Sequence, residues 1–559
     1  MTERPDLHEG LLRRPLSRRN FLTRAGAAVA GSAAALTALE ACSPGTTAQP
    51  SGGKKLDTLV VAVQEGDTRT LDPQSANELT VPMFLKVLYD QLVTFPGSKF
   101  DQVVPALAKD WTVSADGLTY VFNLNPAIKF WNGKPATADD LVFALQRHKN
   151  YKGNTSWFQD SVASVEKTGD MQVTLKLSVM NVDILNILTS PFVSIGYAAT
   201  MKENGATDAV GADKTDTAQQ WLDQHSVGSG PFVLEAWTHG SQITMKRNPN
   251  YWGTPPPFEN VIFKFVADQK VQKDLLVRGD AHIAVNMTPD LAAGLEGNSQ
   301  IGVLTIPSLG FAWLGLHVSN NKYLAIPKNW EAVKYAIDYD GMALIYKGGG
   351  QFVGGVIPPG VTNALPVEER IKKDVTRAKA ALQAAGNPDG FSFVLTYAQD
   401  NLYGNIASTD IAQKVAADLQ AIGIQATLRP VPATQESTEF RAGELEAALH
   451  YWGADYLGWT DFLPVFGPGG HVGGPRHGWQ PEFSPESKQI AEMAAEAQRT
   501  LDPAGQNELC INAQRLMNDY SPMAFLFESN YQVAYRKDVI KSIETNPVWF
   551  IDVGTTELV

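Results

Sequence analysis

The clearest pattern in the chain is an alternation of apolar and other residues that predicts two strand–helix–strand units. In the first unit, every second residue of 261–265 is apolar, which indicates a strand. Asp268 is placed to cap a helix that runs through Val277, and Gly279 ends this helix. Residues 281–287 then predict the second strand. The segment therefore has the pattern of an α/β sheet fragment.

The second unit lies about 130 residues further on. Residues 391–397 predict a strand, Gly423 ends the helix that follows, and 424–428 predict another strand. One face of that helix carries the apolar residues Ile411, Val415, Leu419 and Ile422. Because the two units are far apart and have dissimilar surroundings, we expect two α/β lobes rather than one continuous sheet.

Three other segments carry local signals for secondary structure. Residues 119–124 predict a strand, and Thr137-Ala138-Asp139-Asp140 is a capping box that opens a helix. Residues 507–518 predict a helix in which Cys510 is a small buried apolar residue.

The first 55 residues predict an export signal and a tether. Arg18 and Arg19 precede the mild apolar stretch 25–39, which is the arrangement of a twin-arginine signal. This stretch is shorter than the roughly 20 residues that a membrane helix needs. Leu39-Glu40-Ala41-Cys42 resembles the lipobox of bacterial lipoproteins, in which the cysteine is lipidated, although its second residue departs from the usual small or apolar one. Residues 43–55 have the composition of a flexible tether.

The length, net charge and cysteine content of the chain limit the number of domains and the kinds of partner that are expected. A chain of 559 residues is expected to form two or three domains. The formal net charge is −13 and no sustained run of Lys or Arg occurs, so nucleic acid is not an expected partner. The two cysteines, Cys42 and Cys510, are too far apart to suggest a disulfide framework or a metal site.

Catalytic motifs are not found. Gly228-Ser229-Gly230 is followed at once by proline and does not have the spacing of a nucleophile elbow. The glycine-rich stretch 348–355 lacks the spacing of a phosphate-binding loop and reads as a turn-rich connection. His471 and His477 would bind a metal only with ligands from elsewhere in the chain. We therefore expect no enzymatic activity, metal or cofactor.

An ordered set of short motifs resembles one protein family across nearly the whole chain after the tether. These motifs closely resemble the family 5 extracellular solute-binding proteins, the periplasmic oligopeptide-, dipeptide- and nickel-binding group. They are Leu71-Asp72-Pro73, Trp131-Asn132-Gly133-Lys134-Pro135-Ala136-Thr137-Ala138-Asp139-Asp140, Val227-Gly228-Ser229-Gly230-Pro231-Phe232, Arg247-Asn248-Pro249-Asn250-Tyr251-Trp252-Gly253, Arg278-Gly279-Asp280, Val333-Lys334-Tyr335-Ala336-Ile337-Asp338 and Ala378-Lys379-Ala380-Ala381-Leu382-Gln383-Ala384-Ala385-Gly386.

The resemblance implies an α/β fold of the periplasmic-binding-protein type: a two-lobe Venus flytrap of type II, from the large cluster with an extra subdomain. It also implies that lobe I is assembled from segments that are not consecutive in the chain. The expected bounds are 1–42 for the signal peptide, 43–55 for the tether, 56–72 and 189–305 for lobe I, 73–188 for its extra subdomain, 306–523 for lobe II and 524–559 for the return to lobe I.

The strongest candidate for a binding segment follows an apolar run, residues 445–449, which predicts a buried strand. Ligands of open α/β sheets collect beyond the carboxyl ends of strands. The segment after this run carries Trp452, Gly453, Ala454, Asp455 and Tyr456.

The resemblance adds a role for one residue of this segment. In similar oligopeptide-binding members the aspartate of a Trp-x-Ala-Asp-Tyr motif pairs with the α-ammonium of the peptide, and Asp455 matches it. An alternative is a loop aspartate that caps its own turn. Relatives often continue with Pro-Asp-Pro, whereas this chain has Leu457-Gly458-Trp459-Thr460-Asp461, and Trp459 or Asp461 would then share the ligand contact. Trp157 and Trp313 are further candidates, with core packing as the alternative for each.

Together these features predict an extracytoplasmic, lipid-anchored and monomeric protein that captures an oligopeptide and delivers it to an ABC permease and its ATPase subunits. The same transport role with a non-peptide ligand (an oligosaccharide, a metal chelate or an opine-like molecule) is the first alternative, because one fold serves many ligands. An exported hydrolase is the second.

Overall fold

The computed structural model describes residues 56–64, 68–76, 78–100, 102–403 and 406–559. The predicted export signal with Arg18 and Arg19, the lipidation site Cys42 and the tether lie outside these residues. Within the described ranges, none of the helices combines the length and the apolar character that crossing a membrane requires.

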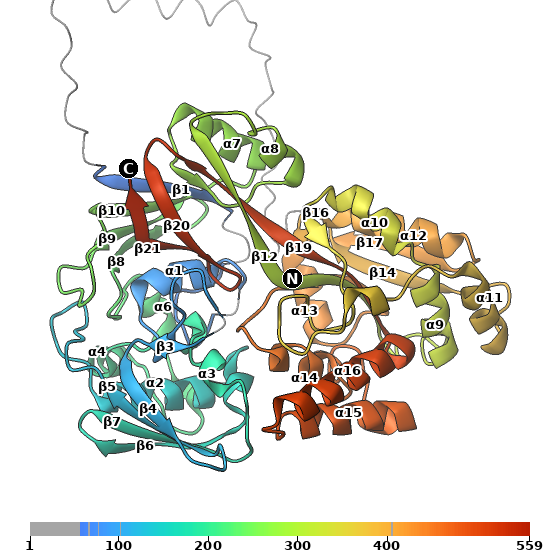
Figure 1. The fold of residues 1–559 in the computed structure, drawn as a ribbon, viewed down its shortest axis with the longest axis horizontal. Helices are drawn as coiled ribbons and strands as arrows, with labels where there is room; N and C mark the ends of the chain where they lie inside the picture. The colour runs from blue at the N-terminus through green and yellow to red at the C-terminus, as the bar shows by residue number, and fades with distance from the viewer. Residues whose placement is uncertain (1–55, 65–67, 77, 101, 404–405) are drawn as a thin grey trace, which may run out of the picture. The chain divides into compact units, whose positions relative to one another are not determined.

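A mixed sheet of 11 strands is the largest sheet in the described part of the chain (Figure 1). Strands far apart in the sequence are neighbours in it. Its order is β17 (Gln425–Val431), β14 (Ser392–Ala398), β18 (Ala447–Trp452), β12 (Ile301–Leu316), β19 (Met523–Arg536), β11 (Ile283–Ala284), β1 (Thr58–Val63), β10 (Asn260–Phe265), β9 (Gln242–Arg247) and β8 (Phe232–Thr238), and β13 (Gly350–Gln351) also pairs with β19.

The expectation that the two strand–helix–strand units do not share a continuous sheet is wrong. The first unit contributes β10 and β11, the second contributes β14 and β17, and both belong to the same path of hydrogen-bonded strands. The connection is the long antiparallel pair β12 and β19, of 16 and 14 residues. A strand of 16 residues spans roughly 50 Å, which is enough to pass from one hydrophobic core into another.

Two large hydrophobic cores define the two lobes. We call lobe I the part of the chain around the core that contains most of the buried apolar residues between Leu59 and Val285 and between Tyr531 and Val553. Lobe II surrounds the core that contains Leu309 to Phe527. Along β12 and β19 the side chains change from one core to the other near Ile306 and Tyr531. The residue bounds expected from the sequence stay predictions.

Lobe II confirms the second predicted unit. Strands β14 and β17 are parallel, and the four apolar residues of helix α12 (Ser408–Gln420) and its end are buried. Gly423 ends this helix with a φ of 91°. The other helices of the lobe are α9 (Pro327–Ala336), α10 (Tyr339–Tyr346), α11 (Val375–Ala384), α13 (Ala433–Arg441), α14 (Leu463–Phe466), α15 (Pro485–Ala497) and α16 (Pro503–Tyr520), which contains the buried, free Cys510. A short hairpin, β15 (Leu402–Tyr403) with β16 (Ile406–Ala407), completes it.

Lobe I confirms most of the first unit. Asp268 accepts a hydrogen bond from the backbone N–H of Val271 and so caps helix α7 (Gln269–Arg278), which Gly279 ends with a φ of 82°. Strand β11 is shorter than the predicted 281–287, although His282 and Val285 still donate backbone hydrogen bonds to β1 on either side of it. Lobe I also contains α1 (Val81–Leu88), α3 (Ile184–Ile187), α4 (Ala198–Glu203), α5 (Ala212–Thr215), α6 (Gln219–Leu222), α8 (Pro289–Ala293) and the pairs β2 (Val93–Thr94) with β3 (Val104–Pro105) and β20 (Ile540–Asn546) with β21 (Phe550–Leu558).

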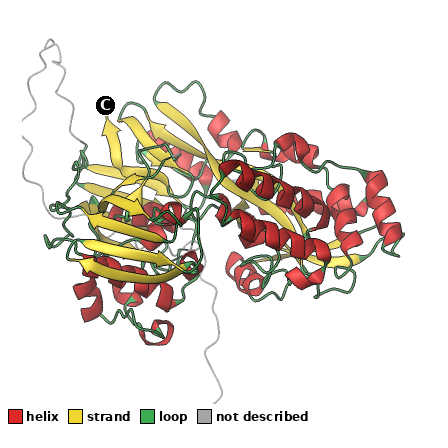
Figure 2. Ribbon diagram, turned by 60° about the horizontal axis from the view of Figure 1, so that its bottom comes forward, coloured by secondary structure: helices red, strands yellow, loops and turns green. Residues whose placement is uncertain are grey.

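The extra subdomain is a separate antiparallel sheet with the helix α2 (Ala138–Tyr151) against it (Figure 2). Its strands are β4 (Ala108–Val113), β5 (Thr119–Leu124), β7 (Gln172–Leu177) and β6 (Val162–Gly169), in that order. The predicted capping box is present: Thr137 and Asp140 bond reciprocally at the start of α2. The strand predicted at 119–124 is confirmed.

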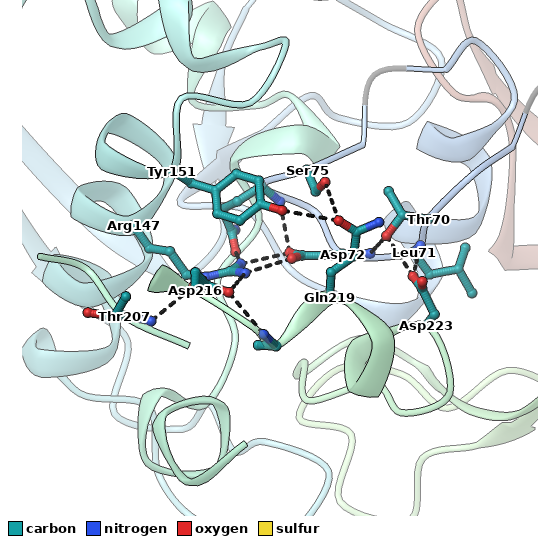
Figure 3. Close-up of polar contacts among 12 residues, drawn as sticks. Thr70, Leu71, Asp72, Ser75, Arg147, Tyr151, Thr207, Asp216, Gln219 and Asp223 are labelled. Carbon is teal, nitrogen blue, oxygen red and sulfur yellow. Dashed lines mark hydrogen bonds and ion pairs between the residues drawn. The ribbon is translucent and has the colours of Figure 1, made fainter. Parts of the chain in front are cut away.

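A completely buried ion cluster joins this subdomain to the rest of lobe I (Figure 3). The guanidinium of Arg147 on α2 donates to both oxygens of Asp72 at 2.7 and 2.6 Å and to both oxygens of Asp216 at 2.7 and 3.0 Å. Its last N–H donates to Gln74 at 2.7 Å. All five donors of the guanidinium are therefore used, which offsets the cost of burying the charge.

Candidate functional site

Strand β18 positions the predicted binding segment. It runs parallel to β14 and antiparallel to β12, where Trp452 is opposite Phe311. The strand starts two residues later than predicted and includes Trp452, so that Gly453 is the first residue beyond its carboxyl end. The candidate residues therefore lie at the edge of the sheet where ligands of α/β folds bind.

The hydrogen bonds of Asp455 involve its backbone and not its carboxylate. Its N–H donates to Asp461 Oδ2 at 2.8 Å, and its carbonyl accepts from Ser190 Oγ of lobe I at 3.0 Å. Among the residues that the structure describes, none donates a hydrogen bond to the carboxylate. Burial raises the pKa of Asp455 to about 7, although the positive charges of Arg476 and Arg441 lower it. The alternative of a side chain that caps its own turn is therefore not what the structure shows.

Several buried polar atoms near Asp455 have no hydrogen-bond partner in the described part of the chain. Asp461 is fully buried and its Oδ1 accepts no bond of standard geometry. The indole N–H of Trp452 makes no such bond either, although Trp452 lowers the pKa of Asp461, and the indole N–H of Trp459 has no partner. Burial raises the pKa of Asp461 well above its usual value, and the negative charge of Asp455 raises it further. Buried polar groups in proteins nearly always have a hydrogen-bond partner. Several buried polar atoms without one in the same region therefore favour a binding site, where a ligand would supply the missing partners.

The residues after Tyr456, where this chain departs from the family pattern, form a contact between the lobes. Asp183 of lobe I accepts hydrogen bonds from the backbone N–H of Thr460 at 3.0 Å and from its hydroxyl at 2.7 Å. Gly458 permits this approach, because a Cβ at that position would lie 2.3 Å from Asp183 Oδ2. The unusual residues of this chain therefore bring the two lobes together beside Asp455.

Aromatic rings also meet across the lobes. Trp157 of lobe I stacks on His471 of lobe II with ring centroids 5.6 Å apart and an angle of 22° between the planes. Tyr456 is buried against Phe158 of lobe I with ring centroids 5.3 Å apart. The structure thus brings Trp157, 298 positions before Asp455 in the sequence, into the same region.

Two predicted candidates are core residues. Trp313 is fully buried in lobe II, where its ring packs against Phe440 and Phe466 and its indole N–H lies 3.4 Å from His477 Nε2, so the structure favours core packing over a ligand contact. The side chain of Ala454 is likewise buried in the lobe II core. Gly453 lies close to lobe I, since a Cβ there would be 2.4 Å from Leu79.

The sequence reasoning did not find Arg476 and Arg441, the two arginines whose positive charge lowers the pKa of Asp455. The available signal was an arginine in the glycine- and proline-rich loop between α14 and α15, one residue before His477. In the described residues no group of acidic, histidine or cysteine side chains is arranged to hold a metal ion, and the two histidines of this loop have other contacts.

The comparisons with known proteins concern the family and the fold of the chain. Residues 102–474 match the model of the bacterial extracellular solute-binding proteins, family 5. The dipeptide-binding protein of Escherichia coli K12 is 26% identical over 516 residues, which cover 86% of this chain and 91% of that protein.

Two solved structures have the same fold. The periplasmic binding protein DppA of Helicobacter pylori, in complex with the peptide STSA, has a TM-score of 0.76 at 21% identity and covers 90% of this chain and 98% of its own. The agropinic acid complex of AgaA from A. tumefacien R10 has a TM-score of 0.76 at 21% identity, with coverage of 90% and 99%. The chain therefore belongs to the bacterial extracellular solute-binding proteins of family 5.

Proposed function

We propose that this protein is the receptor for short peptides of an ABC importer, and that the Asp455 carboxylate binds the α-ammonium group of the peptide. The observation that carries the proposal is the environment of the Asp455 side chain. Its residue contacts both lobes, and no described residue donates a hydrogen bond to its carboxylate. A role in binding rather than catalysis agrees with the family.

The electrostatics of the site support an ammonium ligand. A carboxylate in a desolvated place is unstable as an anion unless a cation accompanies it, and burial accordingly raises the pKa of Asp455 to about 7. A bound ammonium ion would supply the missing charge and hydrogen bonds. Closure of the lobes around an interlobe hinge would then exclude water and strengthen the pair.

Replacement of Asp455 by Asn tests this assignment. Removing one partner of a buried charge pair costs about 2–5 kcal/mol, so trialanine should bind roughly 30-fold more weakly or worse. N-acetyl-trialanine, which has no ammonium group, should bind weakly to the wild type and be insensitive to the substitution. Isothermal titration calorimetry measures both affinities.

The matched control is Asp389→Asn, an exposed aspartate in the loop before β14, at the opposite end of that strand from Asp455. It should leave both affinities unchanged. Equal affinity of trialanine for the wild type and the Asp455→Asn variant would refute the assignment.

A non-peptide ligand is the second candidate, because AgaA, with the same fold, is in complex with agropinic acid. Native mass spectrometry of the purified protein, followed by denaturation, identifies a copurified ligand without assuming its class. A series of short peptides supports the first candidate, and a single non-peptide mass supports the second.

Lipidation of Cys42 after export through the Arg18-Arg19 signal would keep the receptor at the outer face of the cytoplasmic membrane, close to its permease. Cells grown with an alkyne fatty acid should label the protein, whereas Cys42→Ser should abolish the label and release the protein from the membrane fraction. A wild-type protein without label would contradict lipid anchoring.

A further inference from the structure

A groove of about 760 Å³ lies beside the pair of strands that connects the lobes. It is lined by α8 and the loop that follows it, by Val303 and Thr305 of β12, by Gln532 of β19 and by Lys347 of lobe II. Its size is that of a site for a small molecule or a few amino-acid residues. The function proposed above makes no use of it.

The groove and the Asp455 segment lie on opposite faces of the sheet. Thr305 and Gln532 are opposite each other in the strand pair, and their side chains share the face that α8 covers. The next pair, Ile306 and Tyr531, belongs to the main core of lobe I on the other face. On that face a Cβ at Gly453 would lie 3.5 Å from the Tyr531 hydroxyl. The groove is therefore separate from the site around Asp455.

The bonding of β19 shows which backbone groups of β12 point away from it. Gln532 and Arg536 of β19 form backbone hydrogen bonds with residues beside β11. Residues of an antiparallel pair alternate between bonding towards the partner and bonding away from it. Val303 and Thr305 lie opposite Ala534 and Gln532, so their N–H and C=O groups point away from β19, towards the other edge of β12.

This edge of β12 is open in the described part of the chain. β18 pairs with β12 only from Phe311 onwards, and no described residue forms a hydrogen bond with the backbone of Val303 or Thr305 on this side. Pro307 has no N–H and ends the edge after these two residues. Such an edge can pair with an extended peptide of about three residues. It is too short for a protein–protein interface, which buries about 1,200–2,000 Å².

Gln532 also points to a polar occupant of the groove. Its side chain is 9% exposed and lines the groove beside Thr305. Its amide has no hydrogen-bond partner among the described residues. Buried amides are nearly always bonded, so a molecule with donors and acceptors fits this position better than an apolar one.

The charge around the groove is positive by a small margin. Lys347, Lys537 and Glu296 line it, and the ammonium of Lys273 lies beside the end of α8. Lys347 pairs with the exposed Asp290 at 2.7 Å, whereas Lys537 forms no ion pair with a described residue. Three lysines against two carboxylates favour an acidic group on the occupant.

We propose that this groove is a second binding site, which takes a short extended peptide with an acidic side chain by adding it as a strand to the edge of β12. In antiparallel addition, the residue opposite Thr305 directs its N–H and C=O towards β12 and its side chain to the face of Gln532. Its two neighbours lie on the other face, beside the half-buried Leu304. The preferred pattern is therefore apolar–acidic–apolar, and no free α-ammonium is needed.

Acetyl-Val-Glu-Val amide is the probe, because it has the pattern but neither an α-ammonium nor a terminal carboxylate. Isothermal titration calorimetry should give equal affinities for the wild type and for Asp455→Asn. A methyl group on the glutamate nitrogen removes a backbone donor and should weaken binding about 10-fold. Acetyl-Val-Gln-Val amide should bind about 3-fold more weakly than the probe. Hydrogen exchange followed by mass spectrometry should show protection of residues 301–306 by the probe.

Two variants test the residues of the groove. Thr305→Pro removes an N–H that points outwards, which an edge strand tolerates, and it should abolish binding of the probe while the urea unfolding midpoint stays close to that of the wild type. Lys537→Gln should remove the difference between the glutamate and glutamine peptides. The matched control is Lys541→Gln, an exposed lysine of β20 that pairs with Glu557, and it should keep this difference.

Three results would overturn the inference: no binding of the probe to the wild type, loss of its binding in Asp455→Asn, or equal affinity for the methylated and unmethylated peptides. Equal affinity of the wild type for the glutamate and glutamine peptides would refute the acidic preference. Since the probe has no ammonium group, each of these results is independent of whether trialanine needs Asp455, and the two proposals fail separately.

Discussion

Two groups of charged residues in this protein differ in how their charge is compensated. Arg147 is enclosed by Asp72 and Asp216 and uses every donor of its guanidinium, whereas Asp455 and Arg476 are largely enclosed without a direct partner of opposite charge. The first arrangement stabilises the fold. The second leaves unpaired charge where a charged ligand would pair with it.

Replacement of Arg147 by Met should strongly destabilise the protein. The substitution leaves Asp72 and Asp216 buried without their cation, which typically costs about 3–5 kcal/mol. Urea unfolding at pH 7 should show a clear decrease in the transition midpoint. The matched control is Lys176→Met in the same subdomain, because Lys176 and its partner Glu166 are each 48% exposed and such surface pairs contribute less than about 1 kcal/mol. Similar midpoints for the two variants would contradict this account.

Single residues of the site were predictable where a local motif carries them. The Trp-x-Ala-Asp-Tyr resemblance was enough to nominate Asp455, because the motif lies in one short segment; its role stays a proposal. Arg476 could not be found in this way, since its proximity to Asp455 depends on how a loop 21 positions later folds back. Trp157 and Trp313 were equivalent candidates in the sequence, and only the packing of the lobes separates them.

At the scale of elements, the crossing of β12 between the lobes is irregular. Pairing with β19 is interrupted between Pro307 and Phe311, and Leu309 has a φ of 51°, which costs about 1 kcal/mol for a residue with a side chain. The Glu528 carboxylate of β19 accepts bonds from the backbone N–H of Leu309 at 3.1 Å and from Gln351 at 2.8 Å. This buried side chain therefore stabilises the irregular backbone where the two cores meet.

Glu528 should make the stability of the protein depend on pH. Burial raises its pKa from 4.5 to about 7, although the two hydrogen bonds lower it. Between these values the folded state holds a proton that the unfolded state has lost, so stability falls as pH rises from 4.5 to 7, by up to about 3 kcal/mol. In Glu528→Gln this contribution should be absent, and urea unfolding at pH 4.5, 5.5 and 7 measures it as a difference from the wild type. Parallel pH profiles for the two proteins would argue against it.

Elements with strong local signals were predicted to within a residue or two. The capping box of α2, the Asp268 cap of α7 and the glycines that end α7 and α12 act within one helical turn, so the sequence around them suffices. Strand β11 was predicted too long because its neighbours are β1 and β19, which come from opposite ends of the chain. Its length is set by pairing partners that no local pattern reveals.

At the scale of the whole molecule, the sequence indicated two α/β lobes but not the continuity of their sheet. The continuity depends on β12 and β19, two strands separated by more than 200 residues that pair over most of their length. Pairing over such a separation leaves no periodic pattern in either strand. The family resemblance could supply the fold because it spans nearly the entire chain, which local periodicity does not.

The pairing of β12 with β19 also means that, in the order of the chain, lobe II is an insertion into lobe I. Ile306 and Tyr531 are directly opposite each other in an antiparallel pair, and the chain leaves lobe I at one and returns at the other. Two residues in such a position can be joined by a turn of a few residues. Lobe I therefore has the connectivity of a protein with a β-hairpin into which more than 200 residues have been placed, and a chain with a short turn there would need no other rearrangement of the lobe I backbone.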